Sequence, residues 1–243
     1  MTNLPFFDDS GINRVLCIVA HPDDMEYGGS AAVARWTGMG IEVSYLLLTA
    51  GEAGMRSRDP EEVGPLRAQE QRQACHEVGV EDLQVLDFPD GMLEPTLELR
   101  RQIARQIRHV RPDAVVTQPW DLEVEWGLNH ADHRAAGIAT VDAIRDADNP
   151  WVFRELREDQ GLEAWGAQWL LVAGAEPTDL IDVSGDPLEH AVRSLQAHQA
   201  YLDELGDHMD PRQMLESMTS DAARLSAEPT VTHALGVRVY RMG

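Results

Sequence analysis

A short apolar run that ends directly in a cluster of polar side chains constrains this chain more than any other feature. Residues 15–20 read Val-Leu-Cys-Ile-Val-Ala, and His21, Pro22, Asp23 and Asp24 follow at once. A continuous apolar run with β-branched residues predicts a strand that is buried on both faces of a parallel sheet. Pro22 fixes its own φ and favours an extended His21, so the turn is stiff. We therefore expect an imidazole and two carboxylates at the carboxyl end of a strand, where open α/β sheets hold their ligands.

A second polar cluster follows another predicted strand. Residues 114–117 read Ala-Val-Val-Thr, and residues 129–133, Asn-His-Ala-Asp-His, come shortly after and open a helical stretch. His130 and His133 share a face if that helix has already begun, and Asp132 can accept an imidazole N–H and so fix a tautomer. Three nitrogen and oxygen ligands with one open position are typical of a catalytic zinc site. Each cluster alone also fits an acidic loop with an ordinary capping or surface histidine.

The charge balance excludes several classes of function. The chain has 42 acidic and 20 basic side chains, a formal net charge of -22, and every basic residue is arginine. Such a surface disfavours binding to nucleic acids and anionic membranes, and the lack of lysine excludes Schiff-base chemistry. Salt adaptation and a GC-rich source both explain this composition. No apolar run reaches the roughly 20 residues of a membrane span.

The cysteines and the N-terminus predict a cytoplasmic protein. Cys17 and Cys75 are expected to be buried thiols rather than a disulfide framework. The first residues lack the basic segment and apolar core of a signal peptide.

Strands and helices are expected to alternate along the chain. The expected strands cover residues 15–20, 43–49, 84–88, 114–118, 169–173, 179–183 and 233–241, and the expected helices cover 30–39, 66–78, 96–110, 134–145 and 187–204. This alternation is typical of βαβ units and a largely parallel sheet. Because no linker-like stretch divides the 243 residues, we predict a single α/β domain over residues 1–243. The acidic segment 203–228 is expected to be a solvated amphipathic helix, with a lid or an interface as alternatives.

Five motifs, in this order, resemble the LmbE/PIG-L family of zinc-dependent N-acetylglucosaminide deacetylases. They cover most of the chain and are residues 20–26 (Ala-His-Pro-Asp-Asp-Met-Glu), 49–54 (Thr-Ala-Gly-Glu-Ala-Gly), the pair Arg67 and Glu70, 87–91 (Asp-Phe-Pro-Asp-Gly) and 130–133 (His-Ala-Asp-His). The resemblance implies one Rossmann-like, three-layer domain. It also implies an active site at the carboxyl ends of strands one and four.

The resemblance further implies a role for individual residues. It implies that His21, Asp24 and His133 bind the metal, and that Asp23 is the general base that activates the metal-bound water and later protonates the leaving amine. It implies that His130 helps the metal to stabilise the oxyanion and that Asp132 orients His130. The implied substrate contacts come from Arg67, Asp90, Glu52 and His198.

These roles meet the chemical needs of amide hydrolysis. A bound zinc lowers the pKa of its water to about 7, and an imidazole donor helps to stabilise the oxyanion. Ferrous iron suits the same set of ligands. The chain departs from the family at Leu128, where some members carry tyrosine, and in residues 191–201, which keep His198 but lack the family's lysine and Ser-Gln pair. Trp120 and Trp126 flank the approach to the second cluster and are expected either in the pocket or in the core.

The leading prediction is a metal-dependent hydrolase that removes the acetyl group from an N-acetylglucosamine-type sugar or its conjugate. A metal phosphoesterase is the second candidate, although it needs more carboxylate ligands and more basic groups than Arg67 supplies. A non-catalytic metal- or sugar-binding protein is the third, and Asp23 argues against it because a binding site needs no adjacent base. The expected partner is a small amino sugar, and the sequence leaves open whether the protein forms a homo-oligomer.

Overall fold

One sheet of seven strands forms the centre of the molecule. The computed structural model describes residues 3–243. The strands of this sheet are β1 (Arg14–Val19), β2 (Glu42–Leu47), β3 (Asp82–Val85), β4 (Ala114–Thr117), β7 (Trp169–Ala173), β8 (Asp179–Asp182) and β9 (Ala234–Arg241). The strand order is β3-β2-β1-β4-β7-β9-β8, and β9 runs in the direction opposite to the other six strands. This arrangement confirms the predicted, mostly parallel sheet.

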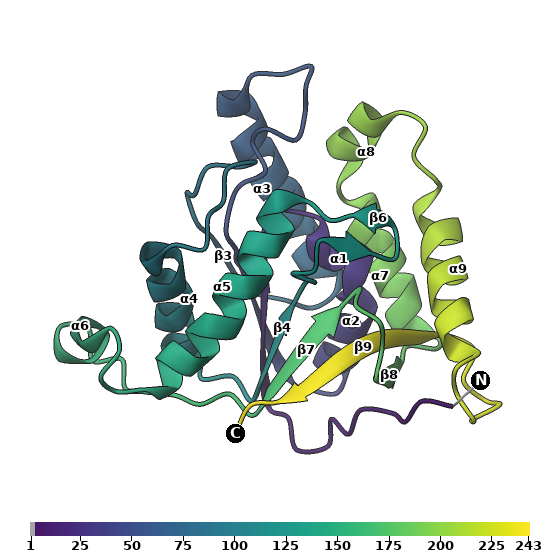
Figure 1. Cartoon of the computed structure of the whole chain (residues 1–243). Coiled ribbons are helices and arrows are strands. Elements are labelled where there is room, and N and C mark those ends of the chain that lie inside the picture. The colour runs from purple at the N-terminus through teal and green to yellow at the C-terminus, as the bar shows by residue number, and fades with distance from the viewer. Residues whose placement is uncertain (1–2) are drawn as a thin grey trace.

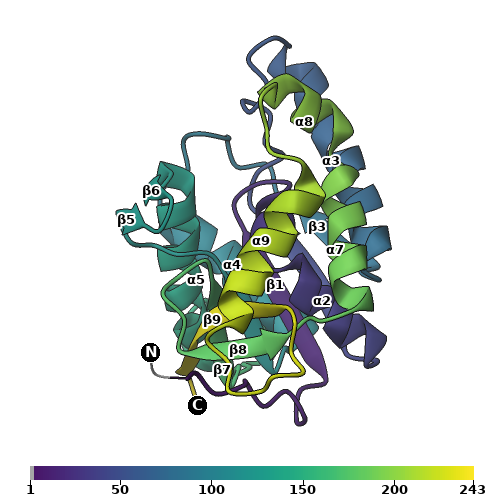
Figure 2. The same ribbon diagram turned by 90° about the vertical axis from the view of Figure 1, so that its right-hand side faces the viewer.

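Helices cover both faces of the sheet, which gives three layers (Figure 1, Figure 2). Helices α2, α7 and α9 and the end of α3 pack on one face, and α4 and α5 pack on the other. The helices are α1 (Asp24–Gly28), α2 (Ser30–Gly38), α3 (Pro60–Glu77), α4 (Leu97–Val110), α5 (Ala131–Asp148), α6 (Arg154–Glu158), α7 (Asp186–Gln196), α8 (Gln199–Leu205) and α9 (Pro211–Ala223). The predicted α/β three-layer fold is therefore confirmed.

The central strand explains why its sequence is apolar without interruption. Side chains alternate along a strand, so Val15, Cys17 and Val19 enter the hydrophobic core on one face of the sheet. Leu16 and Ile18 enter the core on the opposite face. All five side chains are buried. A strand that is covered on both faces has no position for a polar side chain until it ends.

The order of the strands reverses direction between β1 and β4. From β1 the chain proceeds to β2 and β3 on one side, and β4 then pairs with the other edge of β1, with Val15 opposite Ala114 and Cys17 opposite Val116. The connections on the two sides of this point lead away from each other, which leaves a crevice at the carboxyl ends of the strands. Both polar clusters of the sequence follow these two strands.

Helix α3 begins six residues before the predicted start at residue 66. The side chain of Asp59 accepts a hydrogen bond from the backbone N–H of Glu61, and Pro60 occupies the first helical position. These are ordinary signals of a helix start. The prediction was wrong because the glycine and proline in the first turns were read as a loop, whereas Pro65 lies inside the helix.

The predicted helix over residues 187–204 is broken into α7 and α8. The backbone N–H of Ala200 donates to the carboxylate of Glu70 at 2.6 Å instead of continuing the helix, and His198 lies at the break. Short elements that the pattern did not predict are α1, α6 and the hairpin of β5 (Glu123–Val124) and β6 (Gly127–Leu128). Local sequence does not reveal a partner 130 residues away.

The remaining expectations have mixed outcomes. The acidic segment contains α9, which packs on α7 and β9 and buries Leu215, so an amphipathic helix covers residues 211–223 rather than the whole of 203–228. Cys17 and Cys75 are free and buried, as predicted. Trp120 packs against the hydrophobic core on the face of the sheet that α4 and α5 cover, whereas Trp126, in the β5–β6 hairpin, is 59% exposed. Within residues 3–243, no helix is long and apolar enough to cross a membrane.

Replacing Arg108 should destabilise the fold on the side of α4 and α5. This guanidinium is 1% exposed and donates to the backbone carbonyls of Asp146, Ala147, Asn149, Val152 and Phe153. Arg108→Met leaves buried carbonyls without a donor, so we expect the free energy of unfolding in urea to fall by about 2–4 kcal/mol. Arg105→Met, on the same helix, removes an exposed hydrogen bond to Gln160. This control should change the free energy of unfolding by less than about 0.5 kcal/mol. Equal losses in both variants would contradict this account.

Candidate active site

The turn after β1 carries the first half of the site in a strained conformation. Asp23 has φ 87°, in the left-handed region, and caps the short helix α1, which begins at Asp24. A left-handed backbone at a residue other than glycine costs on the order of 1–3 kcal/mol and persists only where the surroundings hold it. The Asp24 carboxylate accepts the backbone N–H of His21 at 2.8 Å, which closes the turn. The side chains of this turn are therefore held in fixed directions.

Three side chains from the two strand ends converge on one point. Ligand atoms of His21, Asp24 and His133 all lie within 4.8 Å of one another. The His133 Nε2 atom is 3.1 Å from Asp24 Oδ1, and His21 Nδ1 is 3.6 Å from Asp24 Oδ2. Burial raises the pKa of Asp24, but the imidazoles of His133 and His21 outweigh it and hold that pKa well below its usual range. Two imidazoles and a charged carboxylate are a donor set that fits a divalent metal ion with an open coordination position.

The environment of His21 indicates which of its ring nitrogens would face the metal. Nε2 lies 3.0 Å from Asp90 Oδ1 and 3.3 Å from Asp132 Oδ2, so Nε2 carries a proton and donates to these carboxylates. In the neutral ring, Nδ1 then keeps its lone pair and faces Asp24, which is the arrangement found where a carboxylate orients a metal-binding histidine. Burial lowers the pKa of His21, but these three carboxylates outweigh it and raise that pKa well above its ordinary value. The metal-free ring is therefore protonated on Nδ1 as well, and a metal ion would displace that proton. A second group of candidate metal ligands consists of His21, His130 and Asp132. This group would use His21 Nε2, which already donates to Asp90 and Asp132.

Asp132 orients a different histidine from the one that the motif suggested. Its fully buried carboxylate contacts His21 and accepts the backbone N–H groups of Gly91 and Leu93, at 2.7 and 3.1 Å. The expected link to His130 exists only through the backbone, since the N–H of Asp132 donates to His130 Nδ1 at 3.3 Å. The expectation that this carboxylate orients His130 is therefore corrected. The loop at Gly91 holds the Asp132 carboxylate beside His21. The short spacing between His130 and Asp132 in the sequence did not reveal this contact.

The loop that contains Asp90 is fastened to a second loop. The backbone N–H of Asp90 donates to the carboxylate of Glu52, and the carboxylate of Asp90 accepts the backbone N–H of Ala53, both at 2.8 Å. Burial raises the pKa of Asp90, but its contact with His21 outweighs this and lowers the pKa. In this structure Glu52 and Asp90 hold the loops beside His21, and their contact with a substrate stays a prediction.

His130 is oriented to donate a hydrogen bond into the site. Because its Nδ1 accepts the N–H of Asp132, the neutral ring carries its proton on Nε2. Partial burial and the neighbouring imidazoles of His21 and His133 lower its pKa, which favours this neutral form. The three rings form a triangle with centroids 5.3–5.4 Å apart. An exposed N–H beside the candidate metal ligands is suited to a developing negative charge.

Asp23, the predicted base, is buried beside the candidate metal ligands. Its side chain is 7% exposed and lies 3.2 Å from the guanidinium of Arg67. Burial raises its pKa to about 6, with Asp24 adding to the effect and Arg67 opposing it. A carboxyl group with a pKa near neutrality can both accept and return a proton.

Arg67 lies beneath the turn. It donates to the backbone carbonyls of Pro22 and Gly51, at 2.6 and 3.1 Å, and the ring of Tyr201 covers it at 3.9 Å. A Cβ atom at Gly51 or Gly54 would clash with its guanidinium, so both glycines of the Thr49–Gly54 motif are needed for space. With 2% exposure, Arg67 organises the turn, and its predicted contact with a substrate stays a prediction.

Glu26, Tyr27 and Tyr201 lie near the site and were not assigned a role from the sequence. Glu26 and His198 are buried together, 3.5 Å apart, and the predicted substrate contact of His198 stays a prediction. The hydroxyl of Tyr27 lies 2.8 Å from Nε2 of His208. Glu26 belongs to the first motif, which was the available signal. The partners of Tyr27 and Tyr201 follow only from the fold, which brings α8 above the carboxyl edge of the sheet (Figure 1, Figure 2).

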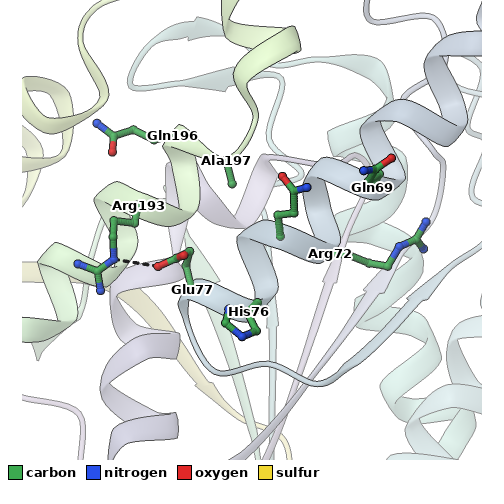
Figure 3. A pocket seen from close by; sticks show the side chains of 8 residues that line it. Gln69, Arg72, His76, Glu77, Arg193, Gln196 and Ala197 are labelled. Carbon is green, nitrogen blue, oxygen red and sulfur yellow. Dashed lines mark hydrogen bonds and ion pairs between the residues drawn. The ribbon is translucent and has the colours of Figure 1, made fainter.

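A separate hollow lies between α3 and α7, away from this cluster. Figure 3 shows that it is lined by polar side chains of the exposed face of α3 and the end of α7, including Arg72, His76 and Gln196. Arg193 donates to Glu77 there at 2.8 Å, so its charge is already paired. The buried face of α3, which carries Arg67, serves the active site instead.

A comparison with family models decides the relationship that the motifs suggested. The model described as PIG-L, GlcNAc-PI de-N-acetylase, matches residues 16–144, a span that holds both polar clusters. The chain belongs to the PIG-L family. The resemblance read from the five motifs is thereby confirmed.

Similar proteins extend the match beyond the PIG-L segment. A diacetylchitobiose deacetylase of Thermococcus kodakarensis is 33% identical over 206 residues, which cover 83% of this chain and 74% of the relative. A probable N-acetyl-alpha-D-glucosaminyl L-malate deacetylase 2 of Bacillus anthracis is 29% identical over 138 residues, 54% of this chain and 59% of the relative. An N,N'-diacetylchitobiose deacetylase structure from Pyrococcus horikoshii superposes with a TM-score of 0.84 at 22% identity, covering 96% of this chain and 85% of that one. The last likeness shows that the two proteins share the same fold.

Asp132→Asn should weaken metal binding. The substitution removes the charge that holds His21 and one of the oxygens that accept from Gly91 and Leu93, and loss of such supporting partners typically costs 10–100-fold in affinity. We expect the dissociation constant for Zn²⁺, measured by competition with a chromogenic chelator, to rise by about that factor. Asp142→Asn, on the same helix at a half-exposed position, is the control. An unchanged affinity in Asp132→Asn would remove this carboxylate from the account of the site.

Proposed function

We propose that this protein is a metal-dependent hydrolase that removes the acetyl group from an N-acetylglucosamine-type sugar or its conjugate. The observation that carries the proposal is the convergence of His21, Asp24 and His133 within 4.8 Å, with the buried carboxylate of Asp23 next to them. Zn²⁺ is the proposed metal because a catalytic zinc site uses three such ligands and one open position. The deacetylase relatives support the same chemistry.

Each step of the reaction has a side chain in a suitable place. The bound metal ion would supply Lewis acidity toward a water molecule and the acyl oxygen. Asp23 accepts the proton of the attacking water as a C–O bond forms at the acyl carbon. The Nε2–H of His130 donates to the acyl oxygen while it carries negative charge. Asp23 then returns its proton to the nitrogen as the C–N bond breaks, which leaves acetate and a free amine.

The alternatives fit the site less well. A two-metal phosphoesterase needs a second set of ligands, but the two candidate groupings among residues 3–243 share His21. Arg67, the basic residue considered for phosphate, is buried and paired with Asp23. A binding protein without catalysis has no use for a strained, buried carboxylate beside the ligands. The hydrolase therefore explains more of the site than either alternative.

Chitobiose-type sugars are the proposed substrates to test first. The relative that covers the larger share of this chain acts, by its name, on diacetylchitobiose. The relative named for a malate conjugate covers 54% of this chain. The net charge of -22 also disfavours an anionic conjugate, because like charges repel over the surface. A neutral N-acetylglucosaminide is the substrate class that agrees with both observations.

Asp23→Asn should abolish most turnover without loss of the metal. The amide cannot accept the proton of water, and loss of a general base typically costs 10²–10⁴-fold in rate. We expect kcat to fall by about that factor while metal content per chain, measured by elemental analysis, equals that of the unchanged protein. Asp159→Asn, at an exposed position, should behave as the unchanged protein in both measurements. An active Asp23→Asn variant would show that another group acts as the base.

Metal analysis paired with an amine-release assay tests the proposed reaction directly. We expect one metal ion per chain and chelator-sensitive release of amine from N-acetylglucosamine and diacetylchitobiose, with slower release from the malate conjugate. Activity after metal removal should return on addition of Zn²⁺, and Fe²⁺ under anaerobic conditions tests the other candidate metal. Protein that binds no metal would sink the mechanism. Metal without amine release from any sugar would favour a binding role.

A further inference from the structure

Glu26 is a buried carboxylate that the proposed reaction does not use. It lies on α1, is 1% exposed, and its side chain lies among α1, α3 and α7. Its oxygens accept hydrogen bonds from Gln71 Nε2 at 3.2 and 3.3 Å and from the hydroxyl of Ser194 at 3.2 Å. The ring of His198 lies 3.5 Å away. A carboxylate is retained in such a place only when it is surrounded by donors, as it is here.

Gln71 connects this carboxylate to the turn that holds the proposed base. Its side chain is 1% exposed. Because the amide nitrogen donates to Glu26, the amide oxygen points the other way, where it accepts the backbone N–H of Asp23 at 3.0 Å. The orientation of the amide is therefore fixed at both ends. One side chain links the buried carboxylate to the strained residue of the active site.

His198 completes the cluster from the far side. It is fully buried at the junction of α7 and α8, and neither ring nitrogen has a hydrogen bond of good geometry. The carboxylate of Glu26 is the charged group that the ring faces at 3.5 Å. Ser194, one turn earlier, also donates to that carboxylate. The end of α7 is thus tied to α1 beneath the active site.

The backbone of Asp23 needs such support. Its left-handed φ of 87° is unfavourable by itself, and in the proposed reaction its side chain must point toward the place where a bound metal would hold the attacking water. A displacement of about 1 Å in a reacting group can cost 10²-fold in rate.

We propose that Gln71, held by Glu26 and His198, is a positioning residue that keeps the backbone of Asp23 in its left-handed conformation and so aims the proposed base. This inference rests on the proposed function and assigns no contact with the substrate to these three residues.

Gln71→Leu tests the inference. The variant keeps the volume of the side chain but cannot accept the N–H of Asp23. We expect kcat for diacetylchitobiose to fall by about 10–100-fold, while KM changes by less than twofold and metal content stays at one ion per chain. Gln73→Leu, at an exposed position of the same helix, is the matched control and should retain kcat. A wild-type kcat in Gln71→Leu overturns the inference.

A double-mutant cycle separates positioning of the base from a general loss of structure. If Gln71 acts through Asp23, then Gln71→Leu should not lower the residual kcat of Asp23→Asn any further. An equal loss in both backgrounds overturns the inference. Gln71→Leu leaves the Glu26 carboxylate with fewer donors, so Glu26→Gln combined with Gln71→Leu is the second variant, in which no charge is left unpaired. The combination should melt within a few degrees of the unchanged protein and show the same loss of kcat.

The cycle also distinguishes this inference from the proposed function. An inactive Asp23→Asn beside a fully active Gln71→Leu overturns the inference alone. A fully active Asp23→Asn overturns the role of the base, and the inference with it.

Discussion

The parallel pairing of β1 with β4 is the constraint on which the site depends. The register that sets Val15 opposite Ala114 brings together the carboxyl ends of two strands that are about a hundred residues apart in the chain. The chain leaves these two strands in opposite directions, so the space above them is free for ligands. His21 and Asp24 come from one strand end and His133 from the region after the other. Neither end alone supplies three candidate ligands, so the candidate metal site forms only because this pair of strands is formed.

Around this centre, buried charges are balanced by specific donors rather than by solvent. Asp132 is neutralised by two backbone N–H groups and His21, and Asp23 by Arg67. Glu26 has the same kind of support from Gln71. A buried charge is tolerated only when such partners are present, so the acidic residues of the site also determine how the surrounding loops pack. Structure and chemistry therefore depend on the same contacts.

Local patterns predicted the strands well and the breaks between helices poorly. Residues 169–173 are a strand as predicted, because burial on both faces leaves an uninterrupted apolar run. The break near His198 was missed because it depends on Glu70, which lies on another helix. The carboxylate of Asp132 was assigned to His130, although it contacts His21, the histidine that follows β1. In both cases the deciding partner is distant in sequence.

The amino-acid sequence by itself determined the class of fold and the family, and it predicted the residue types of the candidate metal site, because apolar periodicity and short motifs are local properties. Only the tertiary structure decided which nitrogen of His21 contacts Asp90 and Asp132 and that Arg67 lies beneath the turn. It also decided that Gln71 holds the backbone of Asp23. These are questions of distance and direction between segments that are far apart in the chain. Hydrogen bonds act over about 3 Å, and only the packed fold sets such distances.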